Sequence, residues 1–288
     1  MLYTIKNDRL TVGVSDYAAE IRSVRGNGCE YIWQPEAGHW QRQAPWLFPI
    51  CGGLFEGRYT YRGRSYEMQK HGFARTSLFT LEGATESSLS FSLSDSLETR
   101  KVYPFAFRLD VTYALQKNRL CCTLTVSNPG EDELIAGLGG HPGFRVPLDG
   151  KGRFDDWFLS FPGAVDPCEM TLSDDLLWSG SKTPFALPDG KLPLARSLFS
   201  RDAHFLAGAG NTVTLGSPLS ERSVTLSWDG FPYLGFWSEP TDVGFLCIEP
   251  WHGLPSVSGR VDDLATKPDL FHIAPGKSET LALRMQFL

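Results

Sequence analysis

The sequence lacks the signatures of most nucleotide-dependent and metal-dependent enzymes. It contains no G-x-S-x-G nucleophile motif, no G-x-x-x-x-G-K phosphate loop, no H-E-x-x-H pair and no complete G-x-G-x-x-G. Its six cysteines include no C-x-x-C pair, and no set of His and Cys residues has zinc-finger spacing. We therefore expect no cofactor and no metal, and we expect the cysteines to be free thiols.

An excess of positive charge and long apolar runs are also missing. The chain has 27 Lys and Arg against 33 Asp and Glu, and this net negative charge repels a nucleic-acid backbone. No apolar run approaches the ~18 residues that cross a bilayer. Residues 1–14 include Lys6, Asp8 and Arg9, which is unlike a signal peptide. We expect a cytoplasmic protein with neither nucleic-acid nor membrane partners.

A hydrophobic period of two is the dominant pattern in the chain. Apolar residues occupy alternate positions from Phe107 to Tyr113 and again from Leu120 to Val126. The polar stretch Gln116-Lys117-Asn118 separates the two runs, and Asn128-Pro129-Gly130 ends the second. Alternation of this kind is typical of half-buried strands joined by a tight turn. The segment is therefore predicted to be a β-hairpin.

Shorter segments with strand character recur along the chain, at residues 2–5, 10–12, 89–93, 224–228, 245–248 and 281–287. No series of amphipathic helices alternates with them, which disfavours a parallel α/β fold. The pattern predicts an all-β protein, a large antiparallel β-sandwich, with residues 1–288 forming a single domain. Residues 148–200 contain many prolines and interrupt this recurrence of strand-like segments. We interpret them as a long loop packed onto the sandwich.

The first segment with candidate chemistry surrounds His71. Gly72 allows the backbone to turn sharply and expose the imidazole. Arg75 lies four residues further on, and its permanently charged guanidinium group presents several N–H donors that suit hydroxyl groups or a phosphate. A histidine that merely bonds a backbone carbonyl at a turn is the alternative interpretation.

The second segment surrounds His141, which follows Gly139-Gly140 and precedes Pro142-Gly143-Phe144. Glycines on both sides are unfavourable in a strand interior, so the backbone is expected to bend or to admit a ligand closely. An ordinary turn with a solvent-facing histidine is the competing interpretation.

The third segment is an apolar strand that ends in a carboxylate. Alternation places Glu249 on the same face as Phe245 and Cys247. If Glu249 is desolvated, its pKa rises towards the range of a useful general base, whereas at a wet rim it is an ordinary surface charge. Pro250 is expected to end the strand, and Trp251 offers a flat face for sugar C–H groups.

Other polar and aromatic residues have weaker settings. Trp237 is expected to lie in the core, although a platform for a ligand is also compatible with its position. No neighbouring residues support a role for His39, His204 or His272.

In their order and spacing, six stretches resemble the aldose 1-epimerase (galactose mutarotase-like) family, and in particular its bacterial LacX-like branch. The stretches are Leu47–Ile50, His71–Arg75, Tyr103–Phe105, Gly139–Phe144, Tyr233–Ser238 and Cys247–Trp251. The resemblance implies the galactose mutarotase-like supersandwich, with a sugar bound in an open cleft on one face.

The resemblance also implies a metal-independent isomerase that interconverts the α and β anomers of an aldohexose. Glu249 would be the base and His141 the acid. Four further residues are expected to bind the substrate: His71, Arg75, Trp251 and Phe144. The expected partner is a monosaccharide or sugar phosphate, and the expected assembly is a monomer or weak homodimer.

One departure from the family concerns Gly53, which stands where relatives commonly carry a sugar-binding arginine. Arg58, Arg62 and Arg75 are candidates to compensate for it, and Asp202 and Asp229 are candidates for the family's substrate-binding aspartate.

These differences leave two alternative functions open: a hexose 6-phosphate mutarotase, and a non-catalytic carbohydrate-binding or sensor protein. A glycosidase is disfavoured because it needs two opposed carboxylates, and only Glu249 has a suitable setting.

Overall fold

The predicted hairpin is present and lies in the middle of a large antiparallel sheet. The computed structural model describes all 288 residues. Strands β10 (Arg108–Gln116) and β11 (Arg119–Ser127) pair over their full length, with Lys117 and Asn118 in the turn. The apolar residues at alternate positions of both strands are buried, as their period of two requires.

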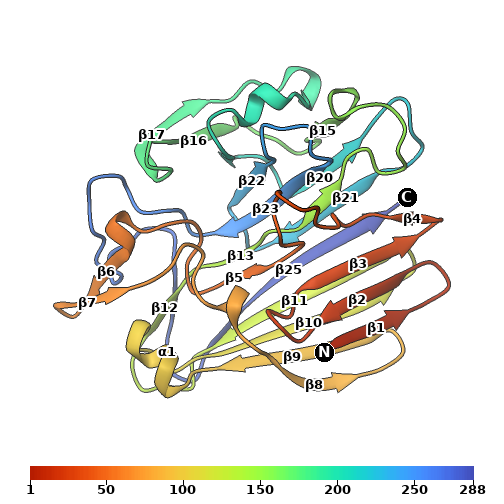
Figure 1. The fold of residues 1–288 in the computed structure, drawn as a ribbon. Coiled ribbons are helices and arrows are strands. Elements are labelled where there is room, and N and C mark those ends of the chain that lie inside the picture. Colours follow the sequence, from red (N-terminus) through yellow and green to blue (C-terminus); the bar gives the residue numbers. More distant parts are fainter.

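The hairpin lies inside a nine-stranded sheet with the order β18-β15-β20-β21-β25-β11-β10-β9-β8, beside the central strand β25. Figure 1 shows its long strands side by side. The other members are β8 (Thr80–Ala84), β9 (Ser88–Ser94), β15 (Phe158–Ser160), β18 (Lys191–Pro193), β20 (Thr212–Gly216), β21 (Val224–Asp229) and β25 (Ser278–Phe287).

A second, eight-stranded sheet has the order β17-β16-β19-β22-β23-β13-β5, with β14 also paired to β23. Its strands are β5 (Trp46–Leu47), β13 (Leu138–Gly140), β14 (Gly143–Arg145), β16 (Cys168–Leu172), β17 (Trp178–Pro184), β19 (His204–Ala207), β22 (Tyr233–Trp237) and β23 (Phe245–His252). All the strand pairs in both sheets are antiparallel.

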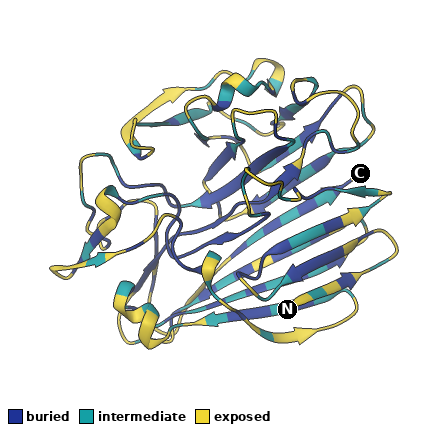
Figure 2. Ribbon diagram, viewed as in Figure 1, coloured by how far each residue is buried: buried dark blue, intermediate teal, exposed yellow.

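Strand β23 separates the core from the second face of its sheet. Leu246 and Ile248 belong to the main hydrophobic core, a cluster of 67 buried residues that includes side chains of both large sheets. Cys247 and Trp251 point the other way and belong to two smaller clusters. Because side chains alternate along a strand, Glu249 lies on this second face. Figure 2 shows that β23 is buried along its length, whereas the edge strands β17 and β8 are exposed.

Smaller elements complete the fold. A four-stranded sheet of β1 (Leu2–Lys6), β2 (Thr11–Ser15), β3 (Ile21–Gly26) and β4 (Cys29–Glu30) packs on the nine-stranded sheet, where Tyr3 meets Phe91 edge to face. The remaining elements are β6 (Arg58–Tyr61), β7 (Arg64–Glu67), β12 (Leu134–Ala136), β24 (Phe271–Ile273) and the helix α1 (Leu97–Val102). Helix α1 begins at a capping box formed by Ser96 and Thr99.

The all-β antiparallel architecture confirms the fold class predicted from the sequence. All six cysteines are free, and three of them are buried. None of the helices has the length and apolar character needed to span a membrane.

The interpretation of residues 148–200 as a loop was wrong. They form β15 and β18 of one sheet and β16 and β17 of the other. Strands β15 and β18 have only three residues each, and β16 and β17 bury little of either face, so no alternation is recognisable.

Candidate active site

An interruption between two strands places His141 opposite Glu249. Strand β13 pairs with Trp251 and His252 of β23, and β14 pairs with residues Phe245 to Cys247. The two residues that link β13 to β14 therefore face the stretch 248–250, and Ile248 N–H donates to the Pro142 carbonyl. The backbone of His141 does not pair with β23 here, and its N–H donates to the Pro45 carbonyl instead.

This arrangement also explains why Pro250 does not end the strand, contrary to the prediction. Ile248 directs its N–H towards the β13–β14 interruption, and Pro250, two residues on, directs its nitrogen the same way. No ladder bond is lost there, so a proline that lacks an N–H is tolerated. Strand β23 continues to His252.

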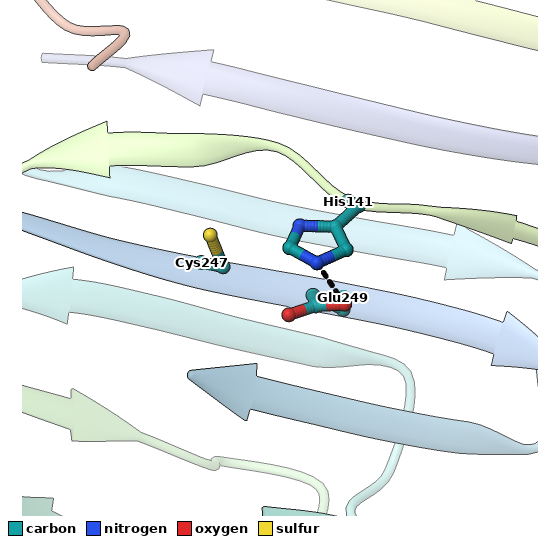
Figure 3. Close-up of side chains that lie close together, drawn as sticks. All are labelled: His141, Cys247 and Glu249. Carbon is teal, nitrogen blue, oxygen red and sulfur yellow. Dashed lines mark ion pairs between the residues drawn. The ribbon is translucent and has the colours of Figure 1, made fainter. Parts of the chain in front are cut away.

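The side chains of His141 and Glu249 are in direct contact. Nε2 of the imidazole lies 3.2 Å from Oε2 of the carboxylate, and the two side chains are 11% and 2% exposed. Figure 3 shows the ring approaching the carboxylate from the β13–β14 connection. Oε2 of Glu249 and Nδ1 of His141 are buried without a hydrogen-bond partner, because the 3.2 Å contact does not have hydrogen-bond geometry. Both groups therefore retain unused capacity to bind a ligand.

Burial favours the neutral form of each group. Desolvation raises the pKa of Glu249 well above its ordinary value, and the charge of Lys70 only partly offsets this. Desolvation, with a smaller contribution from the charges of Arg75, Lys70 and Arg42, lowers the pKa of His141 to about 3. Between the pKa values of His141 and Glu249 the pair consequently holds one proton between two groups.

His71 is fixed by a reciprocal contact with the loop after β5. Its backbone N–H donates to the Gly52 carbonyl at 2.7 Å, and its ring Nδ1 accepts from the Gly52 backbone N–H at 3.0 Å. Because Nδ1 accepts, Nε2 carries the proton and is a donor. Gly72 has a φ of 68°, and an added Cβ there would lie 2.2 Å from the Phe48 carbonyl oxygen. Only glycine fits at this position.

A pocket of about 240 Å³ joins these three residues. Pockets that hold drug-sized ligands are typically ~300–1,000 Å³, so this one suits a ligand of monosaccharide size. Trp40 stacks on the His141 ring with centroids 5.0 Å apart, and Trp251 meets the His71 ring edge to face at 5.5 Å. Flat apolar surfaces beside polar groups are what a sugar ring requires.

Cationic side chains lie beside the pocket without carboxylate partners. Lys70 and Arg75 line it, and neither forms an ion pair. Arg42 adds a third positive charge near Arg75 and donates to the Arg75 carbonyl at 2.6 Å. Asp202 also lines the pocket and has a φ of 90°, which is unusual for a residue other than glycine.

Cys247 lies close to the catalytic candidates. His141, Cys247 and Glu249 offer nitrogen, sulfur and oxygen atoms that all lie within 4.8 Å of one another (Figure 3). Burial and the nearby Glu249 charge raise the pKa of the Cys247 thiol well above its ordinary value. Metal binding needs the thiolate, so this environment disfavours a metal ion. A metal-free site stays a prediction.

Five of the six site residues predicted from the sequence line the pocket, namely His71, Arg75, His141, Glu249 and Trp251. Phe144 is the exception. It is fully buried in the main core and pairs with Leu246, because it stands in β14 on the opposite face from the pocket. A sugar-binding position for Phe144 was therefore wrong.

Several other residues lie elsewhere than the sequence indicated. Trp237 is partly exposed and lines the pocket instead of the core. Arg58 and Arg62 pair with Glu56 and Asp132 at the surface, so of the three arginines considered as substitutes only Arg75 reaches the site.

The two candidate aspartates are also separated by the structure. Asp229 is exposed and pairs with Arg284, whereas Asp202 lines the pocket. Trp40 carries no periodic or motif signal and was missed.

Comparison with known proteins identifies the family. Residues 1–161 match the model of the aldose 1-epimerase family. The chain belongs to this family. Among curated proteins, the plasmid and chromosomal LacX proteins of Lactococcus lactis subsp. lactis are each 33% identical in an alignment of 286 residues that covers 96% of this chain and 95% of theirs.

Two solved structures are similar to this chain over its whole length. A galactose mutarotase related enzyme from Lactobacillus acidophilus is 36% identical, with a TM-score of 0.94 over 100% of this chain and 97% of that one. A galactose mutarotase-like protein from Lactobacillus casei ATCC 334 is 31% identical, with a TM-score of 0.95 over the full length of both chains. The galactose mutarotase-like fold implied by the resemblance is confirmed.

Proposed function

We propose that this chain is a mutarotase that interconverts the anomers of an aldohexose through Glu249 and His141. The observation that carries the proposal is the 3.2 Å contact between these two buried groups inside a pocket of monosaccharide size. Opening a hemiacetal requires one proton to leave the C1 hydroxyl and one to reach the ring oxygen. A pair that shares one proton has one group to accept and one to donate.

In the proposed reaction Glu249 takes the proton from the C1 hydroxyl, and the electrons of the broken O–H bond form the second bond of the carbonyl, while those of the bond between C1 and the ring oxygen leave with the ring oxygen. The bond between C1 and the ring oxygen breaks, and the ring oxygen takes a proton from His141. Rotation about C1–C2 turns the aldehyde, and the reverse steps close the ring on the other face. Each positioned proton transfer typically contributes ~10²–10⁴-fold to the rate.

The sugar itself prepares the pair for these roles. A C1 hydroxyl that donates to Glu249 favours the ionised carboxylate, and the shared proton then resides on His141. Nε2 of His71 is a donor for a substrate oxygen, because its Nδ1 is held by Gly52. Trp251 and Trp40 provide flat surfaces for the sugar ring.

A second candidate, a hexose 6-phosphate mutarotase, is favoured by the unpaired cations. Lys70 and Arg75 both line the pocket without an ion-pair partner in a protein whose net charge is −6. An anionic substituent on the sugar would neutralise them with charge-assisted hydrogen bonds.

Polarimetry of freshly dissolved α-glucose, α-galactose and glucose 6-phosphate tests both candidates. The wild-type protein should accelerate equilibration of at least one of these sugars. If Lys70→Gln and Arg75→Gln reduce the rate for the phosphate far more than for the free sugars, the phosphosugar is the substrate. Wild-type protein that binds sugar without acceleration would overturn the enzyme proposal and support a sensor.

A further inference from the structure

An irregular stretch of the chain places Trp40 over the proposed acid. The connection between β4 and β5 (residues 31–45) contains no helix or strand. The Trp40 ring nevertheless stacks on the His141 ring, with the centroids 5.0 Å and the planes 26° apart. It also stacks on Phe245 of β23 at 5.5 Å and meets Trp237 of β22 edge to face at 5.9 Å. Loops are usually more mobile than strands, so specific contacts must fix this ring.

Glu239 binds two consecutive residues of this connection with its two carboxylate oxygens. Oε1 accepts from the backbone N–H of Trp40 at 2.6 Å, and Oε2 lies 2.7 Å from Nδ1 of His39. Hydrogen bonds that a carboxylate accepts are stronger than those between neutral groups, and this side chain is only 20% exposed. Glu239 stands two residues beyond the end of β22. The contact therefore joins the β4–β5 connection to the sheet that contains Glu249.

Two further features fit the Trp40 ring to this position. Nε1 of Trp33 donates to the Trp40 carbonyl at 3.0 Å, so side chains bind both backbone polar groups of Trp40. A Cβ added to Gly143 would lie 2.7 Å from Cζ3 of Trp40. The absence of a side chain at Gly143 thus allows the indole to lie against the start of β14.

The other aromatic neighbours of His141 meet its ring at steep angles. The ring planes of His71 and Trp237 are inclined to it by 87° and 75°, at 5.7 and 6.1 Å. Trp40 instead lies flat on one face, where it excludes water and contributes to the desolvation that lowers the pKa of His141. Further titratable or charged groups near this ring are Glu249, Cys247, Lys70, Arg75 and Arg42.

We propose that Glu239 is a positioning residue, which keeps Trp40 on the face of His141 and thereby fixes the orientation of the imidazole. The inference rests on the proposed function, because its effect on the reaction requires His141 to be the acid. If the Glu239 contact is removed, Trp40 leaves the imidazole, water reaches the ring, and the ring turns away from Glu249. A displacement of about 1 Å at a reacting group can lower a rate by ~10²-fold.

Three variants test the Glu239 contact. Glu239→Ala removes both carboxylate acceptors, whereas Glu239→Gln retains an oxygen that accepts from the Trp40 N–H. Glu133→Ala is the matched control, because Glu133 forms the same kind of contact with Nδ1 of His272, at 2.9 Å, and does not line the pocket. Should Glu239→Ala not fold, Glu239→Asp takes its place in every comparison, because its side chain is shorter by one methylene.

Polarimetry at saturating sugar gives the first readout. The kcat of Glu239→Ala should fall by about tenfold or more, whereas Glu239→Gln and Glu133→Ala should stay within about twofold of wild type. In a Trp40→Ala background, Glu239→Ala should cost less than about twofold more, because no indole is left to position. An equal loss in both backgrounds would show that Glu239 does not act through Trp40.

The pKa of His141 gives the second readout, measured without sugar by NMR of its ring resonances. Glu239→Ala should raise this pKa from about 3 towards the ordinary value of 6.5, because water then stabilises the charged imidazole. Loss of the Glu239 charge alone acts in the opposite direction, so Glu239→Gln should not raise it. The acid limb of the pH profile should move to higher pH in Glu239→Ala only.

The outcomes separate this inference from the proposed function. If wild-type protein accelerates no sugar, the proposed function fails and NMR still decides the inference. A rise in the pKa of His141 that is confined to Glu239→Ala then supports it, and an unchanged pKa overturns it. An active wild type with a fully active Glu239→Ala, or with Glu239→Gln as impaired as Glu239→Ala, overturns the inference and leaves the proposed function intact.

Discussion

Gly235 lies directly opposite Glu249 in the β22–β23 register, and its missing side chain leaves room for the carboxylate. A Cβ added to Gly235 would lie 3.3 Å from the Cβ of Glu249 and 2.8 Å from the ring of Phe205. Phe205 in turn packs against Trp251, with ring centroids 4.4 Å apart. A glycine on one strand thus sets the position of the proposed base on the next.

The first prediction concerns this contact. Gly235→Ala should displace Phe205 or Glu249, lower kcat/KM by about tenfold or more, and reduce the free energy of unfolding by ~1–3 kcal/mol through overpacking. Gly83→Ala is the control, because an added Cβ there meets nothing within 4 Å. Polarimetry and urea unfolding measure the two effects. Normal activity in Gly235→Ala would show that the β22–β23 spacing does not control the base.

The second prediction concerns the proposed base itself. Glu249→Gln keeps the shape of the side chain but cannot accept the C1 proton, so kcat should fall by ~10²–10⁴-fold. Glu133→Gln serves as the control, because Glu133 is exposed and contacts only His272 at the surface. Polarimetry at saturating sugar gives kcat. A Glu249→Gln protein with wild-type turnover would require a different base.

The third prediction concerns the pH dependence of kcat/KM. Activity needs the pair with one proton, so the acid limb of the profile follows the pKa of His141, which is lowered to about 3, and the alkaline limb follows the raised pKa of Glu249. The charge of Lys70 lowers the pKa of both Glu249 and His141. Lys70→Gln should therefore raise both pKa values and move the whole profile to higher pH, by about half a unit.

The exposed Lys6, on β1 far along the chain from the site, provides the comparison for this shift. Lys6→Gln should leave both limbs of the profile in place. Added salt should shrink the difference between Lys70→Gln and wild type, since screening weakens an exposed charge. A profile that moves to lower pH would contradict the assignment of both groups.

The fourth prediction concerns a buried ion pair that supports one wall of the pocket. Nζ of Lys267 lies 3.2 Å from Asp262 and donates to the Pro255 carbonyl, and Pro255 lines the pocket. Lys267→Met leaves the buried Asp262 with only Arg260 as a partner, so the free energy of unfolding should fall by about 3 kcal/mol. Chemical unfolding measures this, with the exposed Lys277→Met expected to be neutral. An unchanged Lys267→Met would show that this ion pair adds nothing to the free energy of unfolding.

The local pattern of the sequence was enough to predict the class of the fold. Alternation in residues 107–126 predicted β10 and β11 because side chains on a half-buried strand must alternate between core and solvent. The same rule placed Glu249, Cys247 and Phe245 on one face. It failed for residues 168–184, where the strands are short and both of their faces are largely polar.

The sequence by itself determined the types of chemical group available, namely a carboxylate on an apolar strand and imidazoles beside flexible glycines. Only the tertiary structure decided which of them meet. The register of β22 and β23 places Gly235 opposite Glu249, and the interruption between β13 and β14 turns His141 towards the carboxylate. The contact between His141 and Glu249 joins segments that are far apart in the chain. Such contacts depend on strand order and on the direction of each side chain, which also sent Phe144 into the core and Trp237 into the cleft.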